Sequence, residues 1–247
     1  MIGIILQARM GSSRLPGKVL KRIDNIPLLK IQIERIKKVS FPHKLIIATT
    51  TKKEDNSIYE FCIENEINCF RGSENDVLSR YYLCALEYKL KTIIRITGDC
   101  PLIDPLVIDK VTEAFFEQGV DYCSNTVPPE LSKWPDGSDV EVFTIKALTE
   151  ANKFSSKASE REHVTFYFWR NKESKFRIFQ VDNDEDWSNY RFTIDYLEDF
   201  HVIEHIFREI KLRNIFGHVD EVIEILKSNR SIRSMNSNYK FGEGWDL

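Results

Sequence analysis

The sequence predicts an α/β fold: a three-layer α/β/α sandwich with a mostly parallel, Rossmann-like sheet. Three observations point to it. The chain opens with an apolar, isoleucine-rich run of strand length at 2–6. Segments of strand character then alternate with segments whose apolar residues recur at helical spacing. A length of 247 residues, of which 42% are hydrophobic, suits one α/β domain with a full core.

The first half of the chain shows the alternation clearly. After the opening strand, we expect further strands at 45–50, 69–70, 92–96 and 120–123. Helices are expected between them at 29–39, 55–66, 77–90 and 105–118. The last of these begins at Pro105, in the first turn of a helix where proline is favoured. This order implies parallel strands joined by crossovers, with helices on both faces of the sheet.

The pattern changes after residue 124. The segment 126–137 contains three prolines and predicts a loop, which an alternating strand at 139–143 follows. Beyond it we expect a helix at 158–170, a strand at 176–181, an extended segment at 190–194, and helices at 196–211 and 219–227. The polar stretch 228–247 predicts a loose tail. We therefore expect a single domain, 1–247, with an excursion at about 124–145.

Composition excludes several classes of function. The net charge is −3, so no overall basic field favours nucleic acid as a partner. The five cysteines form no CxxC pair, which indicates neither a zinc knuckle nor a disulfide framework. No apolar run reaches transmembrane length, and the N-terminus enters a strand without a charged leader. We expect a soluble, cytoplasmic protein with no membrane partner.

The first candidate site is the loop 9–18, with the sequence RMGSSRLPGK, directly after the opening strand. Ligands of open α/β sheets collect at the carboxyl ends of strands. The two glycines let backbone N–H groups approach an oxyanion closely. Arg9 and Arg14 can fork onto phosphate oxygens, and Lys18 supplies a point charge. The spacing is neither that of the P-loop nor GxGxxG. The alternative is a solvated basic turn.

The second candidate site is the segment Thr97-Gly98-Asp99-Cys100-Pro101, which follows the apolar strand at 92–96. It places one carboxylate, that of Asp99, at the carboxyl end of a strand. Mg²⁺ favours one or two carboxylates together with phosphate oxygens of a substrate. Asp99 therefore fits a metal ligand. The alternative is that Asp99 only forms a turn before proline.

The segment 7–18, QARMGSSRLPGK, resembles the opening motif of the cytidylyltransferase family, which includes the CMP-sugar synthetases for acidic sugars. The most similar branch is the one named after spore coat polysaccharide biosynthesis protein F. The resemblance extends to about residue 205. It implies the fold of the nucleotide-diphospho-sugar transferases, CTP as substrate, Mg²⁺ as cofactor, and a homodimer formed through the 124–145 excursion. It also implies transfer of CMP to a sugar acid, sugar phosphate or polyol phosphate, with release of pyrophosphate, for surface polysaccharide.

The resemblance assigns roles to the loop and to two acids. Arg9, Arg14 and Lys18 would be the catalytic cations on the triphosphate. Asp99 and Asp195 would hold the metal, although Asp195 could instead cap the following helix. The implied nucleotide-binding residues are Ala8, Arg9, Gly11, Ser12, Ser13, Arg14, Lys18, Arg71, Gly72, Ser73, Thr97 and Gly98. No residue rule here separates cytosine from uracil.

The resemblance also implies an acceptor site formed by Glu141, Glu162 and His163. His163 would orient the acceptor or act as a base, or it could be a core histidine with a hydrogen bond. Relatives usually follow Glu-His-Val-Thr with proline, whereas this chain has Phe166.

Two other functions stay open from the sequence. The first is the same fold used with another nucleotide, or as a glycosyltransferase, although Thr97-Gly98-Asp99 lacks the first acid of an Asp-x-Asp metal motif. The second is a nucleotide-binding protein without turnover.

Overall fold

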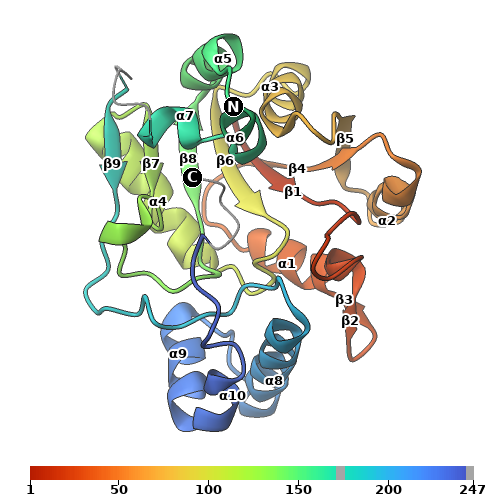
Figure 1. The fold of residues 1–247 in the computed structure, drawn as a ribbon, viewed down its shortest axis with the longest axis vertical. Helices are drawn as coiled ribbons and strands as arrows, with labels where there is room; N and C mark the ends of the chain where they lie inside the picture. Colours follow the sequence, from red (N-terminus) through yellow and green to blue (C-terminus); the bar gives the residue numbers. More distant parts are fainter. Residues whose placement is uncertain (171–175, 243–247) are drawn as a thin grey trace.

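The computed structural model describes residues 1–170 and 176–242. In these residues, seven strands form one sheet in the order β5-β4-β1-β6-β8-β7-β9 (Figure 1). They are β1 (Ile2–Gln7), β4 (Lys44–Thr50), β5 (Asn68–Gly72), β6 (Thr92–Thr97), β7 (Tyr122–Ser124), β8 (Glu141–Thr144) and β9 (Ile178–Gln180). Among these strands, only β8 is antiparallel to its neighbours. The predicted α/β fold with a mostly parallel sheet is confirmed.

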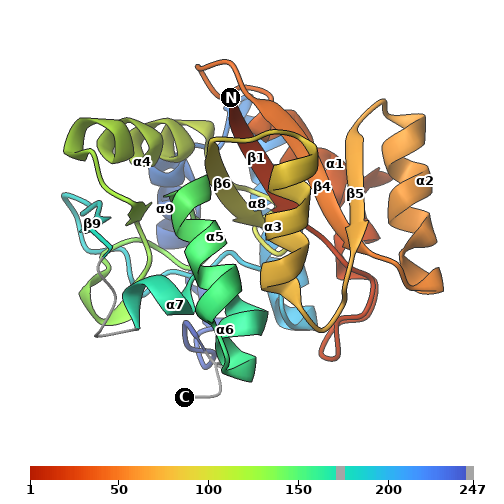
Figure 2. The ribbon, with the colours of Figure 1, turned by 90° about the horizontal axis from the view of Figure 1, so that it is seen from above.

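Helices cover both faces of the sheet (Figure 2). One face carries α3 (Val77–Glu87), α5 (Ile145–Phe154) and α7 (Phe166–Trp169). The other face carries α1 (Leu28–Ile36), α4 (Pro105–Gln118), α8 (Leu197–Arg213) and α9 (Val219–Ser228). Successive side chains of a strand point to opposite faces, so Ile4 packs in one core and Ile5 in the other. The helix α2 (Asn56–Glu64) flanks β5 at the edge of the sheet.

The structure differs from the sequence prediction at three places. The helix expected at 158–170 is two short helices, α6 (Ala158–His163) and α7, separated by Val164 with φ of 57°. The helix α5 was not predicted; the Thr144 side chain caps it by accepting from the N–H of Ala147. The hairpin of β2 (Arg22–Ile23) and β3 (Ile26–Pro27) was also missed; its two turn residues have positive φ.

Two segments for which the sequence predicts no regular structure, the excursion and the tail from residue 228, pack against the rest of the protein. The excursion packs on its own chain: the Trp134 indole N–H donates to the carbonyl oxygen of Val181 at 2.9 Å. The homodimer through this excursion stays a prediction. Of the tail predicted at 228–247, the part 228–242 contains α10 (Arg230–Ser234) and the buried Asn236, and 243–247 lies outside the described residues. In the described ranges, no helix has both the length and the apolar character needed to cross a membrane.

Candidate active site

The loop 9–18 leaves the middle of the sheet, because β1 lies between β4 and β6. Its own backbone fixes its shape. The N–H groups of Ser12 and Gly17 both donate to the carbonyl oxygen of Met10, at 2.9 and 3.0 Å. The N–H of Met10 donates to Asp55 at 2.6 Å. Gly17 has φ of 70°, a conformation that glycine adopts without steric cost. The loop is therefore ordered by contacts within the protein.

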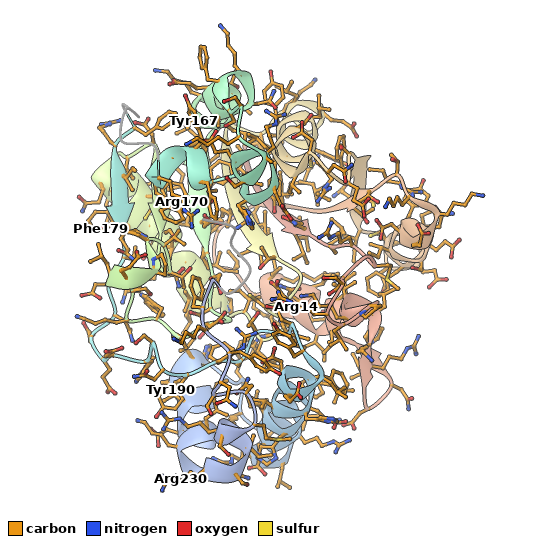
Figure 3. The ribbon with its side chains drawn as sticks, in the orientation of Figure 1. Arg14, Tyr167, Arg170, Phe179, Tyr190 and Arg230 are labelled. Carbon is orange, nitrogen blue, oxygen red and sulfur yellow. The ribbon has the colours of Figure 1, made fainter. Side chains whose placement is uncertain are left out.

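The loop opens onto a cavity of about 540 Å³. The Arg14 side chain extends from this loop to the start of α8, where it contacts Asp195 (Figure 3). The cavity brings together most of the predicted site residues, from segments that are far apart in the sequence. Those that line it are Ala8, Arg9, Ser12, Ser13, Arg14, Lys18, Thr97, Gly98, Asp99, Glu162, His163 and Asp195.

Lys18 joins the loop to both predicted metal ligands. Its Nζ lies 2.9 Å from Asp195 Oδ1 and 3.5 Å from Asp99 Oδ2, and it donates to the carbonyl oxygen of Ile194 at 2.6 Å. Burial alone would lower the pKa of Lys18, but the two carboxylates outweigh it and raise the pKa above its usual range. Burial opposes ionisation of Asp99 too, yet Lys18 and Thr97 keep its pKa low. The two acids and the ammonium form one charged cluster.

Asp195 is the meeting point of three cations. Arg14 Nη2 lies 2.9 Å from Asp195 Oδ1, and Arg191 Nη2 lies 3.4 Å from Oδ2, in addition to the contact with Lys18. The Asp195 carboxylate does not cap α8, because the N-cap of that helix is Tyr196. The N–H groups of Asp195 and Tyr196 both donate to Asp199, at 2.9 and 3.0 Å. The carboxylate of Asp195 is therefore directed to the cations at the cavity.

The donor set suits a divalent cation held partly by a substrate. Asp99 and Asp195 both border the same ammonium, so one small cation could be reached by both. The described ranges contain no group of three or more His, Cys, Asp or Glu residues arranged for a metal. Mg²⁺ needs no such group, because it completes its shell with water and substrate phosphate oxygens. The residues present fit Mg²⁺ of this kind.

Arg191 is a central residue that the sequence did not single out. Its side chain is 9% exposed and lines the cavity. It forks onto Asp199 with two contacts of 2.9 Å, pairs with Asp136, and reaches Asp195. Burial opposes the charge of the guanidinium, but the three acids outweigh it and raise the pKa of Arg191. The one signal in the sequence is its place four residues before Asp195, at the start of the same motif.

The predicted acceptor residue Glu141 does not line the cavity. It lies within β8 opposite Arg95 of β6, with which it forms an ion pair. It also accepts a hydrogen bond from the Tyr122 hydroxyl at 2.6 Å. Its side chain is buried. Glu141 therefore holds Arg95, which does line the cavity.

Asp139, two residues earlier, faces the cavity in its place. It accepts hydrogen bonds from the Thr126 hydroxyl at 2.8 Å and the Gly137 N–H at 3.0 Å. Burial raises the pKa of Asp139 to about 6; the two hydrogen bonds oppose the rise, and the charges of Asp99 and Glu141 add to it.

The raised pKa of Asp139 predicts a pH-dependent stability. The folded state binds this proton more tightly than the unfolded state does. The contribution of Asp139 to the free energy of unfolding therefore falls as the pH rises from about 4 to about 6. Asp139→Asn removes this contribution, so the variant gains stability relative to the wild type between about pH 4 and about pH 7. Urea unfolding at both pH values measures the difference. A constant difference between the two proteins would contradict the assignment.

Four predicted nucleotide-binding residues are not among those that line the cavity. They are Gly11, Arg71, Gly72 and Ser73. The Arg71 guanidinium donates instead to the carbonyl oxygens of Thr50 and Lys52, both at 2.8 Å, and to the Asn56 side chain. It thus fixes the end of β4 rather than facing the loop 9–18. The position of the base stays a prediction.

Glu162 and His163 lie at the end of α6 and line the cavity, as predicted. The His163 ring stacks on the ring of Phe166, with centroids 4.3 Å apart and planes 21° apart. Phe166 is itself buried. Phe166 therefore supports the imidazole ring through this stacking contact.

Comparisons with known proteins agree on one family. The family model described as Cytidylyltransferase matches residues 3–230. Spore coat polysaccharide biosynthesis protein SpsF of Bacillus subtilis is 34% identical over 91% of this chain and 93% of its own. The solved structure of a cytidylyltransferase from Leptospira borgpetersenii is 34% identical, covers 94% of this chain and 96% of its own, and has a TM-score of 0.86.

A more distant structure shares the fold alone. It is that of CMP:2-keto-3-deoxy-manno-octonic acid synthetase complexed with CTP, at 15% identity and a TM-score of 0.62. It covers 84% of this chain and 98% of its own.

Proposed function

Because the chain belongs to the cytidylyltransferase family, we propose that it transfers CMP from CTP to an anionic acceptor, a sugar acid, sugar phosphate or polyol phosphate, for surface polysaccharide. One observation carries this proposal. The cations of the loop 9–18 and the carboxylates of Asp99 and Asp195 border one cavity, and Lys18 contacts both acids. A metal-chelated triphosphate needs this combination of charges.

In the proposed reaction, an acceptor oxygen attacks the α-phosphorus of CTP. The bond from that phosphorus to the oxygen bridging the α- and β-phosphates breaks, and pyrophosphate leaves with the negative charge. Arg9, Arg14 and Lys18 hold the phosphates, and Lys18 stabilises the charge that grows on the leaving group. Mg²⁺ bound by Asp99 and Asp195 would supply Lewis-acid activation and orient the substrate. These are the roles that we assign to the described side chains.

The proton on the acceptor depends on its chemical class. A phosphate acceptor is ionised at neutral pH and needs no strong base. A hydroxyl acceptor must lose a proton, and the lining groups suited to accept it are Asp139 and His163. Glu141, the third predicted acceptor residue, is bound instead to Arg95 and Tyr122.

The proposed function is tested by pyrophosphate release. We expect release with CTP and at least one member of a panel of sugar acids, sugar phosphates and polyol phosphates, and much slower release with UTP, ATP or GTP. The same panel without nucleotide is the control. Tight binding of CTP without release for any acceptor would favour a binding protein without turnover.

We also expect the reaction to require Mg²⁺. Excess EDTA should reduce pyrophosphate release to background, and Mg²⁺ added beyond the chelator should restore it, because the α-phosphate loses its Lewis acid. Asp99→Asn should raise the Mg²⁺ concentration needed for half-maximal rate by about tenfold, since one of two carboxylate ligands is lost. A rate that is insensitive to the chelator would rule out the assigned metal role.

A further inference from the structure

The ion pair of Arg95 and Glu141 lies on the face of the sheet that α3, α5 and α7 cover. Arg95 of β6 is opposite Ile5 of β1, whose side chain packs in the core on that face. The Arg95 side chain is 15% exposed and lines the cavity. Its guanidinium carbon lies 5.9 Å from the centre of the Tyr81 ring, which belongs to α3. The cation therefore reaches the cavity from the sheet, beneath α3.

The guanidinium of Arg95 keeps donors that its acid partner does not use. Nη1 pairs with Glu141, whereas Nε is buried and has no hydrogen-bond partner among the described residues. By contrast, Lys18 contacts two carboxylates and a carbonyl oxygen, and all three nitrogens of Arg191 contact acids.

Of the cations that line the cavity, Arg95 alone has a buried nitrogen without a partner in the part of the chain that the structure describes. A buried donor without a partner is costly, and the cost is recovered when a ligand supplies the acceptor atom. The free donors of Arg95 therefore point to a ligand in the cavity.

Gln7 adds a second unpaired polar atom next to Arg95. In the register of β1 and β6, Gln7 is opposite Thr97, two residues beyond the pair of Ile5 and Arg95. Gln7 and Arg95 are thus diagonal neighbours on the same face of the sheet. Gln7 lines the cavity, and its Oε1 is buried without a hydrogen-bond partner among the described residues. The same part of the cavity therefore offers both a cation and a neutral hydrogen-bond acceptor.

The position of Arg95 favours the acceptor over the triphosphate. The loop 9–18, which we assign to the triphosphate, meets Asp195 at the start of α8, and α8 packs on the other face of the sheet. On the face of Arg95, α6 packs against α3 and brings Glu162 and His163 to the cavity. A negatively charged acceptor is repelled by the carboxylate of Glu162, so it needs a cation on this side. Arg95 is placed to supply that cation.

We propose that Arg95 binds a negatively charged group of the acceptor, a carboxylate or a phosphate, and that Glu141 positions Arg95 for this task. The inference rests on the proposed function and adds a binding residue to it. Glu141 accepts from the Tyr122 hydroxyl at 2.6 Å and holds Nη1 of Arg95, which leaves the edge formed by Nε and Nη2 for the ligand. Two parallel N–H groups on one edge match the two oxygens of a carboxylate or a phosphate.

Initial rates with two variants separate binding from folding. Arg95→Met leaves the buried Glu141 unpaired and should lose stability in urea unfolding, and adding Glu141→Gln should restore part of it. With the panel compound that the wild type turns over fastest, we expect KM for the acceptor to rise about tenfold or more in both variants. KM for CTP should change less than about twofold. Arg213→Met, at an exposed position of α8 paired with Glu209, is the matched control and should change neither KM.

The charge of the acceptor gives a readout that a structural role alone would not change. Each charged acceptor is compared with its neutral counterpart, which is the methyl ester of a sugar acid or the free sugar or polyol of a phosphate. In the wild type, the inhibition constant of the neutral compound should exceed KM of the charged one by about tenfold or more. In Arg95→Met with Glu141→Gln, this ratio should fall close to one. A fall for sugar acids identifies a carboxylate as the bound group, and a fall for phosphates identifies a phosphate.

Three results would overturn this inference: an unchanged KM for the acceptor in both variants, an unchanged preference for the charged compound, or a parallel rise in both KM values. The proposed function would survive each of them, because the wild type would still release pyrophosphate. Absence of pyrophosphate release by the wild type itself would overturn both.

Discussion

Lys18→Ala should lower the rate of pyrophosphate release by about a hundredfold or more, because the proposed reaction assigns Lys18 to the charge that grows on the departing pyrophosphate. The ammonium is only 12% exposed and lies between Asp99 and Asp195. In such a buried site, water is a poor substitute for the ammonium in stabilising the negative charge. The loss should appear in kcat as well as in kcat/KM, since the charge grows only as the bond breaks. Steady-state kinetics with CTP and the best panel acceptor measure it.

Two controls separate chemistry from folding. Lys37→Ala removes an exposed lysine of the α1 end that pairs with Glu34, and it should leave the rate unchanged. Circular dichroism should show that Lys18→Ala keeps its secondary structure, and the affinity for Mg²⁺ should not fall, because a competing cation beside the two acids has been removed. A Lys18→Ala enzyme that turns over at the wild-type rate would remove the loop from the catalytic account.

The sequence predicted the strands, and the loop 9–18 that borders the cavity, because the signals for both are local. A short isoleucine-rich run such as 2–6 strongly favours a buried strand. The glycines and cations of the loop follow it within one short segment of the sequence. It was the resemblance to the cytidylyltransferase family that placed Asp99 and Asp195 together, since each follows a short apolar segment but no local pattern links the two. Their distances to Lys18 confirm that these three groups meet.

The acceptor side was harder to predict. Asp139, and not the predicted Glu141, faces the cavity, and the positions of the two acids show why. The two acids are two residues apart, so an extended chain turns both side chains to the same side. Glu141 lies within the paired part of β8, opposite Arg95 of β6, and its carboxylate forms an ion pair with Arg95 across the two strands. Asp139 lies just before the strand begins and stays at the cavity. The choice depends on where pairing starts, which the alternating pattern does not fix.

The remaining differences come from contacts between distant residues. No glycine or proline marks the break at Val164, whose side chain is fully buried by tertiary packing. The segment 236–242 has a polar composition typical of a tail, yet Asn236 and Tyr239 find partners about forty residues earlier in the chain, at Asp199 and Tyr196. Local sequence patterns do not predict contacts with partners so far away in the chain.

Arg191→Met should destabilise the protein by about 3–5 kcal/mol at neutral pH, because it leaves buried acids without their cation. Asp199 is fully buried, and Arg191 forks onto it while also pairing with Asp136 and reaching Asp195. Methionine conserves much of the side-chain volume, so the loss of charge dominates. Urea unfolding measures the free energy. Arg208→Met, at an exposed position of α8, is the matched control and should cost less than about 1 kcal/mol.

The destabilisation by Arg191→Met should depend on pH and on one partner acid. Burial would raise the pKa of Asp199, but Arg191 and Asn236 outweigh it and lower the pKa. That group therefore stabilises the wild type above its unfolded pKa, and the contribution is lost as the pH falls through the lower, folded value. The difference in the free energy of unfolding between the wild type and Arg191→Met should become smaller as the pH is lowered. Asp136→Asn added to Arg191→Met should recover part of the loss, since burial and Asp139 already raise the pKa of Asp136 and a neutral amide needs no cation. A double variant no more stable than Arg191→Met would mean that Asp136 does not contribute to the destabilisation.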